Sequence, residues 1–255
     1  MTDVTGAGAE LAGRAALVTG GSRGIGYAIA EELLRRGAAV TITGRKEPEL
    51  AAAAAALGGR VLTVAGNAGD PDSRAEAVER TVAEFGDLSI LVNNAGINPQ
   101  FGSLIDADLA AVTRTFDVNV VAALGFAQLA YRAGMAESGG AIVNVASMAG
   151  LRATGAIGAY AASKAALIML TQELAGQLAP AIRVNAVAPA VVRTRFAEAL
   201  YAHDEEGVAK RYPMQRLGRP EGVARAVGFL VSDAESGWIT GETIRLDGGA
   251  LASGR

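Results

Sequence analysis

The sequence predicts a single α/β domain with a doubly wound parallel sheet of about seven strands and helices on both faces. Three observations support this prediction. The chain has 255 residues, enough for one large domain with a buried core. Short apolar runs alternate with helical patterns along its whole length, which is typical of parallel sheets. The turn after the first apolar run is rich in glycine, as in dinucleotide-binding βαβ units.

The alternation of elements is regular from residue 15 onward. Strands are expected at 15–18 and 39–43, and near 60–65, 88–92, 141–146, 182–187 and 243–247. Helices are expected from the glycine-rich turn through Arg36, and near 47–57, 72–85, 108–136, 159–178 and 220–231. The absence of a repeat or linker indicates one domain over residues 13–255. The first twelve residues are small or polar and are expected to form a flexible tail.

Composition excludes several classes of function. A net charge of −3 and a pI near 5.4 argue against nucleic-acid binding, which favours concentrated positive charge. The lack of cysteine excludes disulfides and thiolate metal sites, and we expect no metal. No signal peptide is recognisable, and no apolar run approaches the ~20 residues needed to span a bilayer. A soluble, cytoplasmic protein without a membrane partner is therefore expected.

The glycine-rich turn predicts a cofactor site. Its spacing is GxxxGxG, with a strand before it, a helix after it and a second strand following. Glycines permit a tight turn and close backbone approach, and the helix N-terminus favours a pyrophosphate. Such turns can also serve packing alone, but this context favours dinucleotide binding. The turn residues assigned to the cofactor are Gly20, Ser22, Arg23, Gly24, Ile25 and Gly26.

A Tyr–Lys pair offers acid–base chemistry. Tyr160 and Lys164 are four residues apart in a predicted helix and so share one face. A nearby cation lowers the pKa of a phenol, which is ordinarily ~10, toward the range useful in catalysis. Ser147 follows a predicted buried strand and can come close to the phenol. YxxxK also occurs by chance in helices, so the pair needs the support of the glycine-rich turn.

With these residues assembled, the chain resembles the classical short-chain dehydrogenase/reductase family from about residue 11 to 250. It is similar to 3-oxoacyl-carrier-protein reductases and NADPH-dependent carbonyl reductases. The resemblance implies a Rossmann fold and a homotetramer, with helices 108–136 and 159–178 at one interface and the C-terminal strand region at another. It rests on TGGSRGIG (19–26), NNAG (93–96), DVNV (117–120), Ser147, YAASK (160–164), NAVAPAVVRT (185–194) and ITGETIRLDGG (239–249).

The resemblance also implies residue roles. Tyr160 would be the general acid/base, and Lys164 would lower its pKa and bind the nicotinamide ribose. Ser147 would hold the substrate oxygen, and Asn119 would anchor a water in the proton relay. Further cofactor contacts are implied at Asn94, Ala95 and Gly96 near the adenine-side ribose, and at Pro189, Val192 and Thr194 near the nicotinamide.

The residues after the second strand favour NADP(H) over NAD(H). An acid there pairs with ribose hydroxyls, whereas Arg accepts the extra phosphate. The chain has Arg45 and Lys46 there, with no carboxylate until Glu47, and Arg23 adds a cation. Arg45 and Lys46 can equally be solvated charges. Two positions depart from the family pattern: Asn67 replaces the usual Asp after the third strand, where it can still bond an adenine edge, and Ala follows Pro189 where Gly is usual.

These observations predict an NADPH-dependent oxidoreductase that reduces a ketone or aldehyde, a small-molecule substrate, to an alcohol. Segment 195–215 is expected to form a lid over the site, with His203 an exposed lid residue. One alternative is an NAD-dependent alcohol or sugar-alcohol dehydrogenase working oxidatively. Another is a non-catalytic dinucleotide-sensing protein on the same fold.

Overall fold

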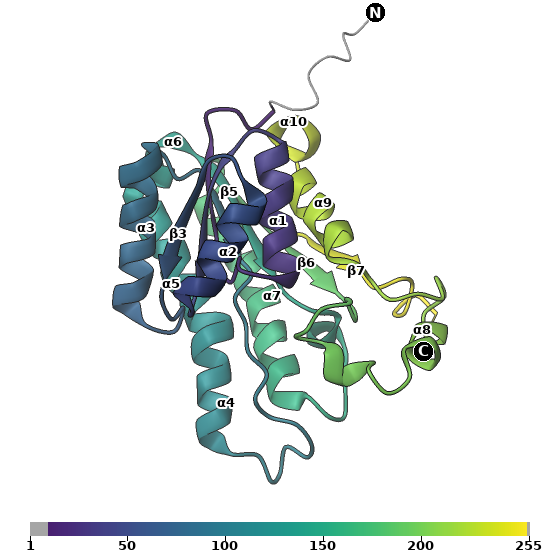
Figure 1. Cartoon of the computed structure of the whole chain (residues 1–255). Coiled ribbons are helices and arrows are strands. Elements are labelled where there is room, and N and C mark those ends of the chain that lie inside the picture. The colour runs from purple at the N-terminus through teal and green to yellow at the C-terminus, as the bar shows by residue number, and fades with distance from the viewer. Residues whose placement is uncertain (1–9, 254–255) are drawn as a thin grey trace, which may run out of the picture.

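The computed structural model describes residues 10–253 and contains one seven-stranded sheet in which every pair of neighbours is parallel (Figure 1). The strand order is β3-β2-β1-β4-β5-β6-β7, so the direction of winding reverses between β1 and β4. This reversal opens a crevice at the carboxyl ends of these strands, where such sheets bind ligands. The predicted fold class is confirmed. The strands are β1 Ala15–Val18, β2 Ala39–Gly44, β3 Val61–Ala65, β4 Ile90–Asn93, β5 Gly140–Val145, β6 Ile182–Pro189 and β7 Thr243–Leu246.

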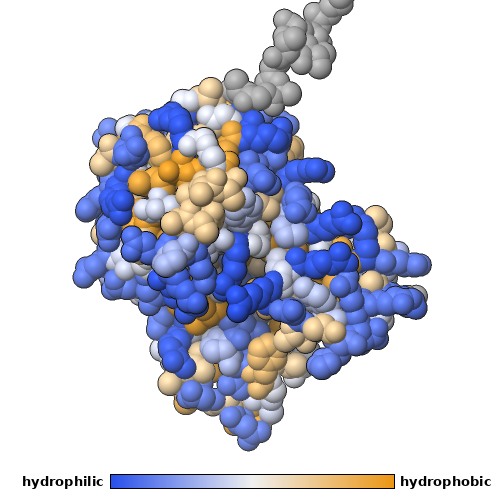
Figure 2. Space-filling view, in the orientation of Figure 1, coloured by the Kyte–Doolittle hydropathy of each residue, from blue (hydrophilic) through white to orange (hydrophobic). Residues whose placement is uncertain are grey.

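Helices cover both faces of the sheet (Figure 1). Successive strand residues point to opposite faces: Ala16 and Val18 of β1 pack in one apolar cluster with α1, α2 and α9, and Leu17 packs in the other with α3, α5 and α7. Hydrophilic residues cover most of the face shown in Figure 2, as expected for the solvent side of such helices. The α-helices are α1 Gly24–Arg35, α2 Glu47–Leu57, α3 Pro71–Phe85, α4 Leu109–Phe116, α5 Ala122–Ala130, α6 Ala136–Ser138, α7 Gly158–Leu178, α8 Glu205–Lys210, α9 Pro220–Val231 and α10 Asp233–Ser236.

Local sequence signals explain where several helices begin and end. Asp70 caps α3 by accepting a hydrogen bond from the Ser73 backbone N–H at 3.0 Å, and Gly86 ends this helix in the left-handed conformation with φ 73°. Gly37, with φ 96°, follows the end of α1 at the position predicted for a C-terminal cap. Both glycines adopt backbone angles that side-chain-bearing residues rarely adopt.

The helix predicted at 108–136 is interrupted by π-helical turns. These turns, η1 Asp117–Val121 and η2 Tyr131–Met135, join α4, α5 and α6. π-turns often mark functional sites, and η1 carries Asn119. By length and hydropathy, Leu109–Ser138 is the one helical stretch within residues 10–253 that is long and apolar enough to cross a membrane. Core helices of soluble proteins pass the same test, and Phe126 and Ala130 pack into the core.

The start of the domain differs from the predicted boundary at residue 13. Leu11 is buried in the core, and its backbone N–H donates to the Arg36 carbonyl at 2.8 Å. Glu10 forms an ion pair with Arg36 at 3.1 Å. Residues 10–12 therefore belong to the packed domain rather than to a tail, because Leu11 gains burial by folding against α1. The rest of the predicted tail, residues 1–9, lies outside the described residues.

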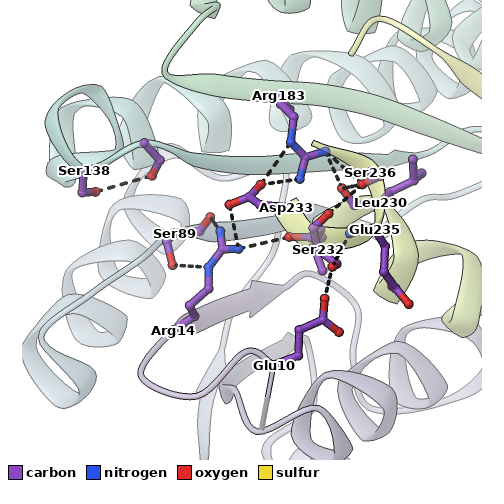
Figure 3. A network of polar contacts seen from close by, with 12 residues as sticks. Glu10, Arg14, Ser89, Ser138, Arg183, Leu230, Ser232, Asp233, Glu235 and Ser236 are labelled. Atoms are coloured by element: carbon purple, nitrogen blue, oxygen red, sulfur yellow. Dashed lines mark hydrogen bonds and ion pairs between the residues drawn. The ribbon is translucent and has the colours of Figure 1, made fainter. Parts of the chain in front are cut away.

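A polar network fastens the amino-terminal edge of the sheet, opposite the crevice (Figure 3). Arg14 donates to the carbonyls of Ser89 and Val231, each at 3.0 Å, and pairs with Asp233. Asp233 also accepts from Arg183 at 2.7 Å. The network joins the starts of β1, β4 and β6 to α10. The candidate site residues lie at the opposite edge, where the strands end.

Candidate active site

The glycine-rich turn between β1 and α1 has no room for side chains at its centre. A Cβ at Gly26 would lie 2.3 Å from the Gly20 carbonyl oxygen and 2.5 Å from Asn94 Nδ2. Gly20 and Gly24 have positive φ angles of 67° and 58°. Within residues 10–253, no side chain caps the N-terminus of α1. Its first backbone N–H groups are therefore available to an anion, and the turn fits the pyrophosphate of a dinucleotide.

The NNAG segment after β4 is fastened to this turn. Asn94 Nδ2 donates to the carbonyls of Thr19 at 2.8 Å and Gly20 at 3.1 Å. The Thr19 hydroxyl accepts from the backbone N–H groups of Asn94 at 3.0 Å and Ala95 at 2.9 Å. The side-chain amide nitrogen of Asn94 therefore holds the turn in place, a role that the sequence did not reveal. A contact from Asn94 to a ribose stays a prediction.

The end of β6 and the start of the predicted lid approach the same turn. A Cβ at Gly24 would lie 3.4 Å from Thr194 Cγ2, so Thr194 lies against the start of α1. Pro189 ends β6, and its carbonyl accepts from the Ser147 hydroxyl at 3.5 Å. Val192 is buried and forms an isolated bridge with Gly218. The structure therefore brings Pro189 and Thr194 to the crevice, whereas a cofactor contact from Val192 stays a prediction.

Ser147, Tyr160 and Lys164 converge between β5 and α7. The Ser147 hydroxyl is hydrogen-bonded to Tyr160. Lys164 Nζ lies 5.7 Å from the centroid of the Tyr160 ring and donates to the Val145 carbonyl at 2.7 Å. The trio inferred from an i,i+4 pair and a strand-end serine is thus assembled at one place, at the carboxyl end of β5.

The pKa of Tyr160 differs from the expectation. Burial raises it to about 12, and the hydrogen bond with Ser147 lowers it only in part. Burial also lowers the pKa of Lys164 to about 8. Desolvation disfavours the charged form of both groups, and Lys164 is not among the causes that shift the pKa of Tyr160. The Tyr160 phenol therefore holds its proton more tightly than a free phenol does.

Asn119 connects the NNAG loop to α7. Its Oδ1 accepts from the Ile97 backbone N–H at 2.8 Å, and its Nδ2 donates to the Ile97 carbonyl at 3.0 Å and to Ser163 Oγ at 2.9 Å. Ser163 in turn donates to the Tyr160 carbonyl at 2.7 Å. A Cβ at Gly96 would lie 3.3 Å from Asn119 Oδ1 and 3.5 Å from Lys164 Nζ. Gly96, Asn119 and Lys164 therefore meet, and Ser163 is a positioning residue that sequence reasoning missed, although it stands inside YAASK.

Charged side chains gather at the carboxyl end of β2. A Cβ at Gly44 would lie 3.5 Å from Ser22 Oγ, which places Ser22 beside this strand end. Arg45 and Lys46 follow β2 and are exposed. Glu49 pairs with both Arg23 and Lys46, and sequence reasoning missed it because it reaches back from the first turn of α2. Asn67 is exposed at the end of β3, the neighbour of β2, and its Oδ1 accepts from the Gly69 N–H at 3.1 Å.

Segment 195–215, the predicted lid, approaches Tyr160 through Phe196. It contains a short 3₁₀ turn, Glu198–Leu200, and α8. The rings of Phe196 and Tyr160 lie 6.1 Å apart. Tyr212 is buried in a small apolar cluster with Leu217 and Ala250, which anchors the end of the segment. His203 is exposed, as predicted.

Comparisons with known proteins identify a family and relatives of this chain. A family described as enoyl-(acyl carrier protein) reductase matches residues 20–250. The human dehydrogenase/reductase SDR family member 4 is 38% identical, with 94% of this chain and 88% of the relative covered. A cis-4-hydroxycyclohexanecarboxylate dehydrogenase from Sinomonas cyclohexanicum is 40% identical over 96% of this chain and 99% of the relative. A short-chain dehydrogenase/reductase (glucose/ribitol dehydrogenase) from Brucella melitensis superposes with a TM-score of 0.89 at 32% identity, covering 94% of this chain and 98% of that one.

Fold and site together define an oxidoreductase with a crevice for a nicotinamide dinucleotide. The chain belongs to the short-chain dehydrogenase/reductase family, and the predicted resemblance is confirmed. Members of this family act on small-molecule substrates.

Proposed function

We propose that this protein is an NADPH-dependent reductase that converts a ketone or aldehyde into an alcohol. The observation that carries the proposal is the Tyr160 phenol, which is hydrogen-bonded to Ser147 and has Lys164 Nζ 5.7 Å from its ring centroid. A carbonyl that is being reduced needs a proton donor at its oxygen, and a buried phenol with a raised pKa retains its proton until that oxygen becomes basic. The cations at the end of β2 support NADPH as the reductant.

Each group of residues has a defined task in this proposal. When bound, the nicotinamide supplies the hydride. The glycine-rich turn and the N-terminus of α1 hold the pyrophosphate, and Thr194 lies against them. The Ser147 hydroxyl holds the substrate oxygen, and Tyr160 donates its phenolic proton to that oxygen. The Lys164 ammonium stabilises the phenolate that remains, because an opposite charge nearby favours the ionised form.

The bracket formed by Asn119 and Ser163 keeps the phenol in position. It ties the N-terminal part of α7 to the loop that follows β4, so the backbone of Tyr160 is held from one side. Catalytic groups must be held within a fraction of an ångström of the reacting atoms. These hydrogen bonds therefore keep the phenol of Tyr160 positioned for proton transfer.

The substrate is proposed to be largely apolar near its carbonyl. Phe196 lies beside Tyr160 and is 58% exposed, so its ring is available to a ligand. Phe101 and Leu104 are also more than half exposed. The loop that carries them is fixed beside α7 by a hydrogen bond of 2.8 Å from the Gly102 N–H to the Ala156 carbonyl. Apolar side chains with few polar groups among them are usual in small-molecule sites.

The reverse direction is the second candidate. The relatives include a hydroxycyclohexanecarboxylate dehydrogenase and a glucose/ribitol dehydrogenase. The same residues can oxidise an alcohol with NAD⁺ if Tyr160 accepts the proton. A purely dinucleotide-sensing protein is disfavoured, because Asn119, Ser147, Tyr160 and Lys164 are all present and assembled.

A homotetramer is also proposed. Leu109, Val121 and Tyr131 expose 76%, 53% and 43% of their surface along the helix that contains η1, and Met169 exposes 56% on α7. Exposed apolar side chains on two neighbouring helices suit contact with a second copy of the chain.

The test is the oxidation of NADPH and, separately, NADH against a panel of ketones, aldehydes, quinones and acetoacetyl thioesters. The proposal predicts turnover of one carbonyl class with NADPH preferred. A clear preference for NADH would overturn the NADPH proposal, and turnover of NAD⁺ with a parallel panel of alcohols would then establish the second candidate.

A further inference from the structure

One of the two carboxylates in the first turn of α2 pairs with cations at the carboxyl end of β2. Glu49 lies in the first turn of α2, and its two oxygens bind different partners. One oxygen is 3.2 Å from an Arg23 guanidinium nitrogen, and the other is 3.1 Å from Lys46 Nζ. Arg23 belongs to the glycine-rich turn and Lys46 precedes α2. Glu49 therefore joins two segments that both border the cofactor crevice.

Positive charge exceeds negative charge around this carboxylate. The hydrogen bond from Lys46, followed by the charges of Lys46, Arg23 and Arg195, lowers the pKa of Glu49. Arg45 is exposed one residue after the end of β2 and has no ion-pair partner within residues 10–253. Three cations thus act on Glu49, and Arg45 is next to Lys46 in sequence. Against Glu47 and Glu49 they leave a surplus of positive charge, which suits a ligand with two negative charges.

These ion pairs are open to exchange. The side chains of Arg23 and Lys46 are 54% and 70% exposed, and that of Glu49 is 37% exposed. Ion pairs in such settings are weak and are screened by salt. A phosphate monoester carries close to two charges and three strong acceptor oxygens, so it binds the same cations more strongly than one carboxylate does.

We propose that Glu49 is a specificity-determining residue that occupies Arg23 and Lys46 in place of the 2′-phosphate of the cofactor. Glu49 lowers the affinity for NADPH and leaves the affinity for NADH unchanged. The preference for NADPH over NADH is therefore smaller than the cations alone would produce. This inference rests on the proposed cofactor site at the end of β2. The sequence did not reveal Glu49 because an acid that favours NAD(H) is expected directly after β2, whereas Glu49 lies in the first turn of α2.

The test measures binding by calorimetry and needs no turnover. Wild type, Glu49→Gln and the control Glu47→Gln are titrated with 2′,5′-ADP and with 5′-AMP. Glu47 is a matched control, because it is exposed in the same first turn of α2 and forms no ion pair within residues 10–253. Glu49→Gln should tighten 2′,5′-ADP roughly three- to tenfold and change 5′-AMP less than about twofold. The gain should shrink in high salt, and Glu47→Gln should leave both ligands unchanged.

Three results would overturn the proposal. Unchanged binding of 2′,5′-ADP would show that Glu49 does not compete for the cations, and weaker binding would show that it preorganises them for phosphate. A loss of 5′-AMP affinity would show that it accepts the ribose hydroxyls. The wild-type data separate this inference from the proposed NADPH preference. If wild type favours 2′,5′-ADP and Glu49→Gln changes nothing, only the role of Glu49 fails. If wild type shows no preference and Glu49→Gln creates one, only the NADPH preference fails.

Discussion

Replacing Lys164 with Met should remove a pH dependence of stability that the buried ammonium creates. Burial lowers the pKa of Lys164 from 10.5 to about 8 in the folded protein. Below pH 8 the amine is protonated in both folded and unfolded states, so folding bears the full desolvation cost. As the pH rises from 8 to 10.5 the folded protein loses its proton first, and the cost disappears. Stability from this group therefore increases with pH across that window.

The magnitude follows from the difference between the two pKa values. A difference of about 2.5 corresponds to roughly 3 kcal/mol at neutral pH, and about 2 kcal/mol of this is recovered between pH 7 and pH 9.5. Between pH 7 and pH 9.5 few other side chains titrate, because the chain has no cysteine and one histidine, and ordinary tyrosine and lysine side chains titrate near pH 10 or above. Tyr160, with its pKa raised to about 12, acts in the opposite direction and only above pH 10.

Urea unfolding at half-unit pH steps measures this effect, with protein concentration fixed because any oligomer shifts apparent stability. Wild type should gain stability up to pH 9.5 relative to Lys164→Met. The control Lys210→Met removes a lysine that is 68% exposed and should follow wild type. Parallel curves for wild type and Lys164→Met would refute the assignment of Lys164 as a buried cation with a lowered pKa.

Two further predictions concern the turn and the start of the domain. Gly26→Ala should abolish measurable binding of either dinucleotide by calorimetry, because its Cβ would meet the Gly20 carbonyl oxygen at 2.3 Å. Retained binding would show that the turn can open. Leu11→Ala should lower the free energy of unfolding by about 2–5 kcal/mol, since Leu11 is 1% exposed in the core. A loss below about 0.5 kcal/mol in urea unfolding would place residues 10–12 in a loose tail after all.

The alternation of strands and helices could be predicted because strands and helices each have a characteristic spacing of apolar residues in the sequence. The strand 39–43 and the stop at Gly37 depend on neighbours in sequence, and the structure has both within a residue. The convergence of Ser147 and Tyr160 could be predicted because the end of a strand can face the start of the helix that follows it. The burial of Leu11 could not be predicted, because a single apolar residue among small ones forms no periodic pattern.

Side-chain contacts between distant segments gave no signal in sequence. Ser163 bonds Asn119 across 44 residues, and Glu49 bonds Arg23 across 26. The pKa of Tyr160 depends on how much water its surroundings exclude, and sequence spacing shows the neighbouring lysine but not that exclusion. These features require the packed structure.

The central claim is that Tyr160 supplies the proton, and Tyr160→Phe tests it most directly once a substrate is found. The variant removes one oxygen atom from a partly buried ring, and Tyr131→Phe, at a 43% exposed tyrosine on η2, is the control. We measure NADPH turnover by absorbance and NADPH affinity by calorimetry. The account predicts that turnover falls by a factor of about 10²–10⁴ while affinity stays within about twofold, and that the control equals wild type. Turnover above about a tenth of wild type would contradict the account and assign the proton to another group.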